Sequence, residues 1–265
     1  MKLANRMKAK GVFFDLYGTL LILGDMRQAW SDWLDALYAG LCRRGAELTR
    51  PEFEDRCHQF FGKQEPPAAD GLTVFERRIR RLASGLGLAV DARELKVMAT
   101  QACNAWQQHV RTDPEALEVL AALKLSKTLA LISNFDHPPH AYQVLREAGL
   151  DGFFQTIVVS GEVGIKKPDP GIFRLALERT GLRPEAVVYV GDTREDIKGA
   201  TAAGIRPILI ARPEGPNQPG ILDYTRRDEQ PLDRIVSNCP FSAVTIRSLR
   251  EVDGIVDGRH GSWRR

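Results

Sequence analysis

Short apolar runs alternate with helical patterns along most of the chain. Six runs are rich in valine, isoleucine and other apolar residues: 12–14, 128–132, 156–159, 186–190, 207–210 and 243–246. Near-continuous runs of this kind are typical of strands that are covered on both faces, as in a parallel sheet. Since the later runs are separated by helical patterns, the sequence predicts a doubly wound α/β domain with a mostly parallel sheet.

Turn and cap residues mark where the helices between these strands begin and end. Asp113-Pro114 and Asp169-Pro170 each predict a helix start, with aspartate as the N-cap and proline in the first turn. Three glycines stand where helices are expected to end: Gly149, Gly181 and Gly204.

The segment from about residue 24 to 111 has no convincing strand. Apolar residues from Met26 to Leu41 recur at helical spacing, and Asp91 with Glu94 resembles a capping box that opens another helix. We therefore expect a helical insertion at 23–111 within an α/β core of residues 1–22 and 112–256. Residues 257–265 are expected to form a disordered basic tail.

Composition and charge exclude several classes of function. The 265 residues carry a net charge of +3, an ordinary globular balance, so no nucleic-acid partner is expected. No apolar stretch could span a bilayer, and the first apolar run is too short for a signal peptide. The four cysteines form no CxxC pair, which argues against a zinc site or a disulfide framework. We expect a cytoplasmic protein with a small-molecule substrate, whose oligomeric state the sequence leaves open.

Polar residues follow four of the predicted strands. Asp15 ends the first, Ser133 and Asn134 end the second, Lys166 and Lys167 follow the third, and Asp192 and Asp196 follow the fourth. Because ligands bind at the carboxyl ends of parallel strands, these side chains are expected to converge at one edge of the sheet.

This set suits phosphoryl transfer from a phosphate monoester. A carboxylate can attack phosphorus and form an aspartyl-phosphate, which divides one difficult displacement into two easier ones. An anionic nucleophile approaching an anionic substrate needs positive charge, which magnesium (Mg²⁺) on carboxylate oxygens, a lysine and a hydroxyl would supply.

Four motifs appear in order along the chain: DLYGTL, ISN, GIKKPDPGIF and VGDTREDIKGATAAGI. Together they resemble the haloacid dehalogenase-like (HAD) hydrolase superfamily. The resemblance spans residues 11 to about 211, and TIRSLREV at 245–252 is similar to the family's last strand and helix. It implies that the helical insertion is a cap that closes over the active site and excludes water.

The resemblance also implies a role for each motif residue. Asp15 matches the nucleophile, and its carboxylate, the backbone carbonyl of Tyr17 and the Asp192 carboxylate match the magnesium ligands. Asp196 matches the second acid of the last motif, which usually supports metal-bound water and so belongs to the expected metal site. The remaining matches are Ser133 and Asn134 to the phosphate contacts, Thr19 to the residue that steadies the first loop, and Lys167 to the catalytic cation. Lys166 is expected to be only a solvated neighbour, and His137 and His140 to be loop residues.

Tyr17 departs from the phosphatase pattern. Phosphatases of this superfamily usually have a second aspartate there, which protonates the leaving alcohol, and tyrosine, with an ordinary pKa of about 10, is a poor replacement. The Asp-x-Tyr-Gly-Thr motif resembles 2-haloacid dehalogenases, whereas Gly191-Asp192-Thr193 and Phe173 do not. We predict a magnesium-dependent phosphatase that favours good leaving groups. The alternatives are a metal-free dehalogenase with an Asp15 ester intermediate, and a non-catalytic scaffold that binds phosphate or a partner.

Overall fold

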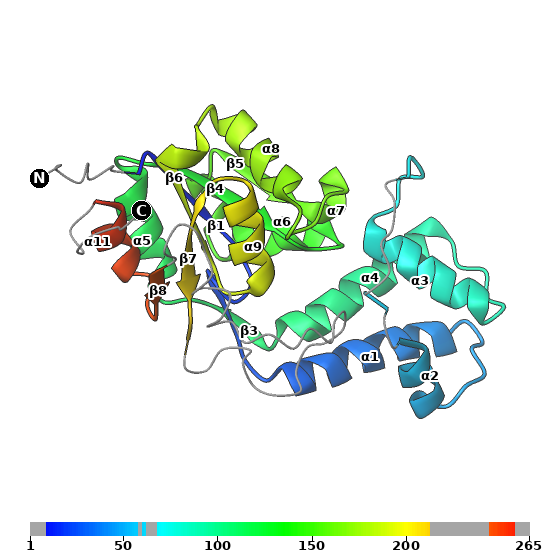
Figure 1. Cartoon of the computed structure of the whole chain (residues 1–265). Helices are drawn as coiled ribbons and strands as arrows, with labels where there is room; N and C mark the ends of the chain where they lie inside the picture. The colour runs from blue at the N-terminus through cyan, green and yellow to red at the C-terminus, as the bar shows by residue number, and fades with distance from the viewer. Residues whose placement is uncertain (1–8, 58–59, 62–67, 213–243, 258–265) are drawn as a thin grey trace, which may run out of the picture.

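A parallel sheet forms the centre of the protein (Figure 1). The computed structural model describes residues 9–57, 60–61, 68–212 and 244–257, so the predicted basic tail lies outside the described residues from 258 onward. The six strands are β1 (Gly11–Phe14), β4 (Thr128–Ser133), β5 (Thr156–Val159), β6 (Val187–Gly191), β7 (Arg206–Ile210) and β8 (Val244–Ile246). They lie in the order β5-β4-β1-β6-β7-β8, and every neighbouring pair is parallel. Each predicted apolar run is a strand of this sheet, which confirms the predicted fold class.

Helices cover both faces of the sheet. One apolar cluster joins Val12 and Phe14 of β1 to α5 (Ala116–Lys124), α6 (Pro138–Glu147) and α11 (Glu251–Val256). A second joins Phe13, which points to the opposite face, to α8 (Pro170–Thr180) and α9 (Arg194–Ala202). The short helices α7 (Ser160–Val163), η1 (Asp151–Phe153) and η2 (Pro184–Ala186) complete the connections. The central strands are therefore buried on both faces, as their near-continuous apolar sequences predict.

One of the two predicted aspartate-proline helix starts is confirmed and the other is displaced. Asp169 caps α8 and accepts a hydrogen bond from the Gly171 amide at 2.7 Å. The helix after Asp113 begins two residues later than predicted, at Ala116, although the Asp113 carboxylate still accepts a hydrogen bond from the Glu115 amide at 2.7 Å, while its other oxygen lies 2.5 Å from the Arg212 guanidinium. The predicted glycine stops are confirmed, since Gly149, Gly181 and Gly204 all have positive φ.

Four helices lie together beside the sheet layer (Figure 1): α1 (Met26–Cys42), α2 (Arg50–Cys57), α3 (Val74–Gly85) and α4 (Ala92–Gln107). They share an apolar cluster of their own, which includes Trp33, Phe53, Phe75 and Met98. Asp91 and Glu94 form the predicted capping box at the start of α4. The division of the chain into domains at residues 23 and 111 stays a prediction.

A short antiparallel ribbon of β2 (Leu21–Leu23) and β3 (Val110–Thr112) connects these helices to the sheet. The sequence analysis found no convincing strand from about residue 24 to 111 and was wrong about β3, and β2, just before that segment, was not predicted either. Three-residue strands are too short to show a periodic pattern, and these two form a separate two-stranded sheet. The ribbon brings both connections to one place, where the Gly24 amide donates to the His109 carbonyl at 2.8 Å.

Candidate active site

The carboxyl ends of three adjacent strands bring the candidate residues together. Asp15 follows β1, Ser133 is the last residue of β4 and Asp192 follows β6, with β1 lying between the other two strands. The Asp15 amide donates to the Val190 carbonyl at 2.9 Å, which fixes the backbone from which the carboxylate projects. From β1 the strand order proceeds through β4 to β5 on one side and through β6 and β7 to β8 on the other, and open α/β sheets bind ligands where the order reverses in this way.

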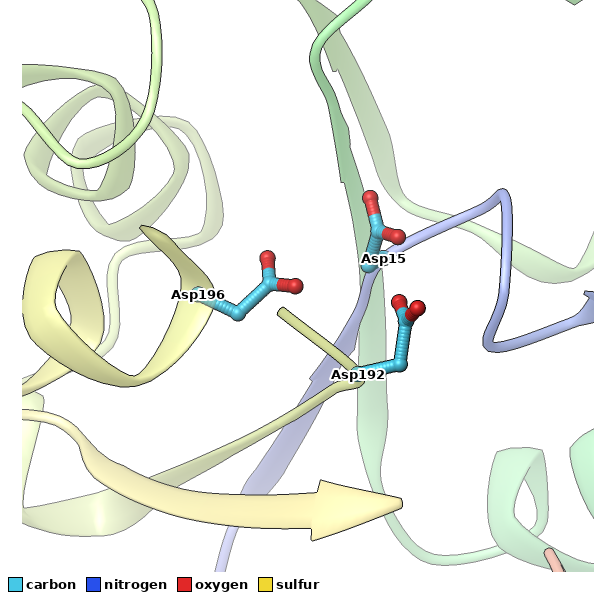
Figure 2. Close-up of side chains that lie close together, drawn as sticks. All are labelled: Asp15, Asp192 and Asp196. Atoms are coloured by element: carbon cyan, nitrogen blue, oxygen red, sulfur yellow. The ribbon is translucent and has the colours of Figure 1, made fainter. Parts of the chain in front are cut away.

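Three carboxylates meet at this edge (Figure 2). Asp15, Asp192 and Asp196 each offer one oxygen, and the three oxygens lie within 4.8 Å of one another. Asp15 and Asp192 come from strand ends, whereas Asp196 comes from the first turn of α9. All three residues are buried or nearly so.

Two glycines make this close approach possible. A Cβ at Gly18, where φ is +86°, would lie 2.0 Å from Oδ2 of Asp192. A Cβ at Gly191 would lie 2.4 Å from Cγ of Asp196. Any other residue at either position would displace a carboxylate of the cluster.

Lys167 lies against this cluster from the loop between α7 and α8. Its Nζ is 2.5 Å from Asp15 Oδ1 and 2.7 Å from Asp196 Oδ1, and it donates to the Tyr189 hydroxyl at 3.2 Å. Burial alone would lower the pKa of this ammonium, but the charges of Asp15 and Asp196 outweigh burial and raise it. Lys167 is therefore held as a buried cation between two carboxylates.

The single lysine does not balance the three acids. Burial raises the pKa of Asp15 to about 6, even though Lys167 opposes the shift. Burial, together with Asp15 and Asp196, also raises the pKa of Asp192 well above its ordinary value. The cluster therefore has excess negative charge and hard oxygen donors, and this combination fits a divalent cation such as Mg²⁺.

Asp196 is held by hydrogen bonds at both of its oxygens. Oδ2 accepts from the amide and the hydroxyl of Thr193, at 3.0 and 2.6 Å, and Oδ1 accepts from Lys167 and from the Tyr189 hydroxyl at 2.8 Å. Burial raises the pKa of Asp196, but Lys167 and Thr193 more than offset this effect, so the pKa is lowered. The carboxylate thus positions Lys167 and caps α9, and its predicted part in the metal site stays a prediction.

Tyr189 is a site residue that the sequence analysis missed. It lies in β6 among valines and is fully buried, and its hydroxyl contacts Lys167, Asp196 and the Ile132 carbonyl. A buried tyrosine hydroxyl needs a partner, so one tyrosine within an apolar strand near a charged site was the available signal.

The two residues predicted to contact phosphate differ in their surroundings. Ser133 is buried at the end of β4, the strand that pairs with β1. The Asn134 side chain donates to the Lys167 carbonyl at 3.0 Å and accepts from the Lys167 amide at 2.9 Å. Its amide group therefore positions the Lys167 backbone, and its contact with phosphate stays a prediction. Thr19 donates to Asp192 Oδ1 at 3.2 Å and so supports that carboxylate.

Tyr17 is held by residues of α4 and of the loop after β4. Its hydroxyl donates to Gln107 Oε1 at 3.3 Å, and its ring stacks on Phe135 and meets the edge of Trp106, each with centroids 5.1 Å apart. Gln107 Oε1 also lies 3.2 Å from Nε2 of His140. Burial raises the pKa of Tyr17 well above its ordinary value. The hydroxyl thus stays protonated and is a weak acid.

The aromatic residues of helices α1–α4 and of the loops between them do not all lie beside Tyr17. Trp106 contacts Tyr17, whereas Trp33 lies with Phe60 and Phe61 in the apolar cluster of the helical segment. The prediction that His137 and His140 are loop residues was wrong for His140. It lies in α6, which begins at Pro138 directly after His137.

The family model for haloacid dehalogenase-like hydrolases matches residues 9–204. Phosphoserine phosphatase of Thermus thermophilus is 42% identical over 108 residues, which are 40% of this chain and 43% of that protein. N-acetylmuramic acid 6-phosphate phosphatase of Pseudomonas aeruginosa is 25% identical over 257 residues, which cover 89% of this chain and 100% of that protein.

Among solved structures, the HAD phosphatase from Thermococcus onnurineus has a TM-score of 0.61 at 22% identity, over 93% of this chain and 97% of that one, which supports the fold. The chain spans less than half the length of the first curated relatives it matches. Within the described residues, no helix combines the length and apolar character needed to cross a membrane.

Proposed function

Because the chain belongs to the haloacid dehalogenase-like hydrolase family, we propose that this hydrolase is a magnesium-dependent phosphatase of small phosphorylated metabolites. The observation that carries the proposal is the contact of Lys167 with Asp15 beside the buried Asp192 carboxylate. Neither a buried cation between acids nor an excess of carboxylates is needed for folding, since unpaired buried charge is costly. Relatives that are named as phosphatases support the same class of reaction.

In the proposed reaction, a carboxylate oxygen of Asp15 attacks the phosphorus of the monoester. A bond forms between that oxygen and phosphorus, and the bond to the leaving oxygen breaks, with its electron pair going to the leaving group. The ammonium of Lys167, 2.5 Å from Asp15 Oδ1, offsets the negative charge that comes together in this step. Ser133 would donate its hydroxyl hydrogen bond to the transferring group. Water then attacks the phosphorus and the bond between phosphorus and the Asp15 oxygen breaks, with its electron pair returning to the carboxylate. The water oxygen leaves as part of inorganic phosphate, and one of its protons passes to the phosphate or to solvent.

The carboxylates of Asp15 and Asp192, with the backbone carbonyl of Tyr17, would hold the magnesium ion. The ion would neutralise charge between the carboxylates and the substrate phosphate. Without it, attack on a phosphate dianion would have to proceed against the excess negative charge of the acidic cluster.

The surroundings of Tyr17 define the leaving groups that the enzyme would favour. The hydroxyl is bonded to Gln107 and its pKa is raised, so it is poorly suited to protonate an alkoxide. A leaving group of low basicity needs no such proton. The rings of Tyr17, Phe135 and Trp106 would offer an apolar surface beside it.

The test is release of inorganic phosphate from p-nitrophenyl phosphate, acetyl phosphate and a panel of metabolite monoesters, with and without Mg²⁺. We expect Mg²⁺-dependent release that is lost in Asp15→Asn. Absence of phosphate release together with chloride release from 2-chloropropionate would favour a dehalogenase, which is the function that Tyr17 alone suggests. Mg²⁺ binding without turnover of any substrate would favour a non-catalytic scaffold. The cytoplasmic location stays a prediction.

A further inference from the structure

A four-residue segment, residues 134–137, connects β4 to α6 and contacts both the Lys167 loop and the helical segment. On one side, Asn134 hydrogen-bonds to both the amide and the carbonyl of Lys167. On the other side, the Phe75 amide of α3 donates to the Asp136 carbonyl at 3.0 Å, and the Thr73 hydroxyl lies 3.0 Å from His137 Nδ1. The same short segment therefore contacts the backbone of the catalytic lysine and the first turn of α3.

Asp136 is the charged centre of this segment. Its Oδ2 accepts from Arg78 Nε of α3 at 2.9 Å, and its Oδ1 lies 2.7 Å from Lys166 Nζ. The side chains of Asp136 and Arg78 are only 7% and 2% exposed, while that of Lys166 is 39% exposed. The prediction that Lys166 is only a solvated neighbour was wrong, because this ammonium pairs with a buried carboxylate. A buried carboxylate needs such partners, so losing one of them is costly.

The segment is also fixed to the core between its two ends. The Phe135 amide donates to the Ser160 hydroxyl at 3.0 Å, and the Gly161 amide donates to the Phe135 carbonyl at 3.1 Å. A Cβ at Gly161 would lie 2.6 Å from that carbonyl oxygen, so the two backbones are closely packed. Because the backbone is closely packed here, we expect a displacement of Asp136 to displace Asn134 as well.

We propose that Asp136 is a positioning residue that couples the seating of α3 on the core to the placement of Lys167. With Arg78 in place, both oxygens of Asp136 have a cation, and segment 134–137 holds the Lys167 backbone through Asn134. When the Arg78 contact is lost, Asp136 turns toward Lys166 alone, and the hydrogen bond from the Lys167 amide to Asn134 weakens. The inference concerns the same site as the proposed function, but its first readout does not depend on activity.

Hydrogen exchange of the Lys167 amide tests the coupling directly, because that amide donates to the Asn134 side chain. We compare Arg78→Gln with Arg80→Gln, a matched control on the same helix whose side chain is 46% exposed and pairs with Asp70. We expect the Lys167 amide to exchange about tenfold faster in Arg78→Gln, the factor that loss of roughly one hydrogen bond produces. In Arg80→Gln it should match the wild type, and amides of β6 should be unchanged in both variants.

A kinetic comparison separates positioning of Lys167 from a general loss of structure. With p-nitrophenyl phosphate and Mg²⁺, Arg78→Gln should lower kcat about tenfold and change KM much less, and Arg78→Lys should restore part of kcat. Adding Arg78→Gln to Lys166→Gln should lower kcat by a different factor than it does in the wild type, because both cations act through one carboxylate.

An unchanged Lys167 amide in Arg78→Gln, or independent effects of the two substitutions, would overturn the coupling. If the amide responds but the wild type hydrolyses no phosphate ester, the coupling stands and the proposed function fails. If Arg78→Gln does not fold by circular dichroism, Asp136→Asn replaces it with the same exchange readout, since it keeps the shape and removes the charge.

Discussion

Replacing Asp192 by asparagine should stabilise the metal-free protein and remove its stabilisation by Mg²⁺. The Asp192 carboxylate is buried beside those of Asp15 and Asp196, and its pKa is raised well above the ordinary value by burial and by these two neighbours. Asparagine has nearly the same shape, and its oxygen can still accept from the Thr19 hydroxyl, which now lies 3.2 Å from Asp192 Oδ1. The substitution therefore removes charge with little change in packing.

The size of the effect follows from the geometry of the cluster. Two like charges within 4.8 Å of each other, the limit that the cluster's oxygens satisfy, repel by at least about 3.5 kcal/mol at an effective dielectric constant of about 20. Two such repulsions act on Asp192, but Lys167 offsets part of them and proton uptake by the cluster limits the remainder. We expect the free energy of unfolding of metal-free Asp192→Asn to exceed that of the wild type by about 2 kcal/mol, which corresponds to a rise in Tm of about 4–8 °C for a protein of roughly this size.

Thermal unfolding at neutral pH, in EDTA and across a Mg²⁺ titration, measures both effects. The free energy of unfolding of the wild type should rise by about 2.7 kcal/mol when Mg²⁺ is at about 100 times its Kd, and that of Asp192→Asn should hardly change. Asp35→Asn, which removes a surface carboxylate that is 60% exposed, is the matched control and should keep the Mg²⁺ response. A lower Tm for Asp192→Asn in EDTA, or an undiminished Mg²⁺ shift, would refute the reasoning.

Three further predictions test other parts of the site. In EDTA, the free energy of unfolding of the wild type should fall by about 3 kcal/mol relative to that of Asp15→Asn as pH rises from about 4 to about 6. Burial raises the pKa of Asp15 from 3.8 to about 6, so the folded state favours the protonated carboxyl group. The stability that this protonation contributes is lost as pH rises through the folded-state pKa. Denaturant midpoints across this pH range measure the difference, and parallel curves would contradict it. Tyr189→Phe should lower stability by about 1.5–3 kcal/mol, since it removes a buried hydroxyl that donates to Asp196 at 2.8 Å, and calorimetry should show this loss. Tyr17→Asp should raise kcat/KM for alkyl phosphates relative to aryl phosphates, because it supplies a group that can protonate an alkoxide. Across a series of esters graded by leaving-group pKa, log kcat/KM should then depend less steeply on that pKa than in the wild type. An unchanged slope would count against the assigned role of Tyr17.

Much of the fold follows from local patterns in the sequence. The strands β1, β4, β6 and β7 are buried almost throughout, so their hydrophobic character is nearly continuous and easy to recognise. Parallel strands end at a common edge, which is why Asp15, Ser133 and Asp192 could be expected together before their distances were known. The two glycines beside the acidic cluster belong to the same motifs, and the structure gives the steric reason for each of them.

Contacts between side chains from distant parts of the chain were harder to predict. Lys166 and Lys167 are adjacent and chemically identical, yet one pairs with Asp136 and the other with Asp15 and Asp196. Their different surroundings depend on segment 134–137, which lies about thirty residues earlier in the chain. No local periodicity encodes such a contact, because it depends on the packing of β4 beside β5 and of α3 on the loop between β4 and α6.

Tyr17 combines both kinds of information. The sequence shows that it replaces the expected acid, but its contacts with Gln107 and Trp106 of α4 are seen only in the folded chain. A residue so occupied cannot approach a leaving oxygen without giving up its hydrogen bond and its packing against Phe135. Selectivity at this position should therefore come from how well a leaving group packs on the aromatic rings and how readily it departs unprotonated. The search for the natural substrate should begin with phosphorylated compounds whose leaving groups are weakly basic and partly apolar.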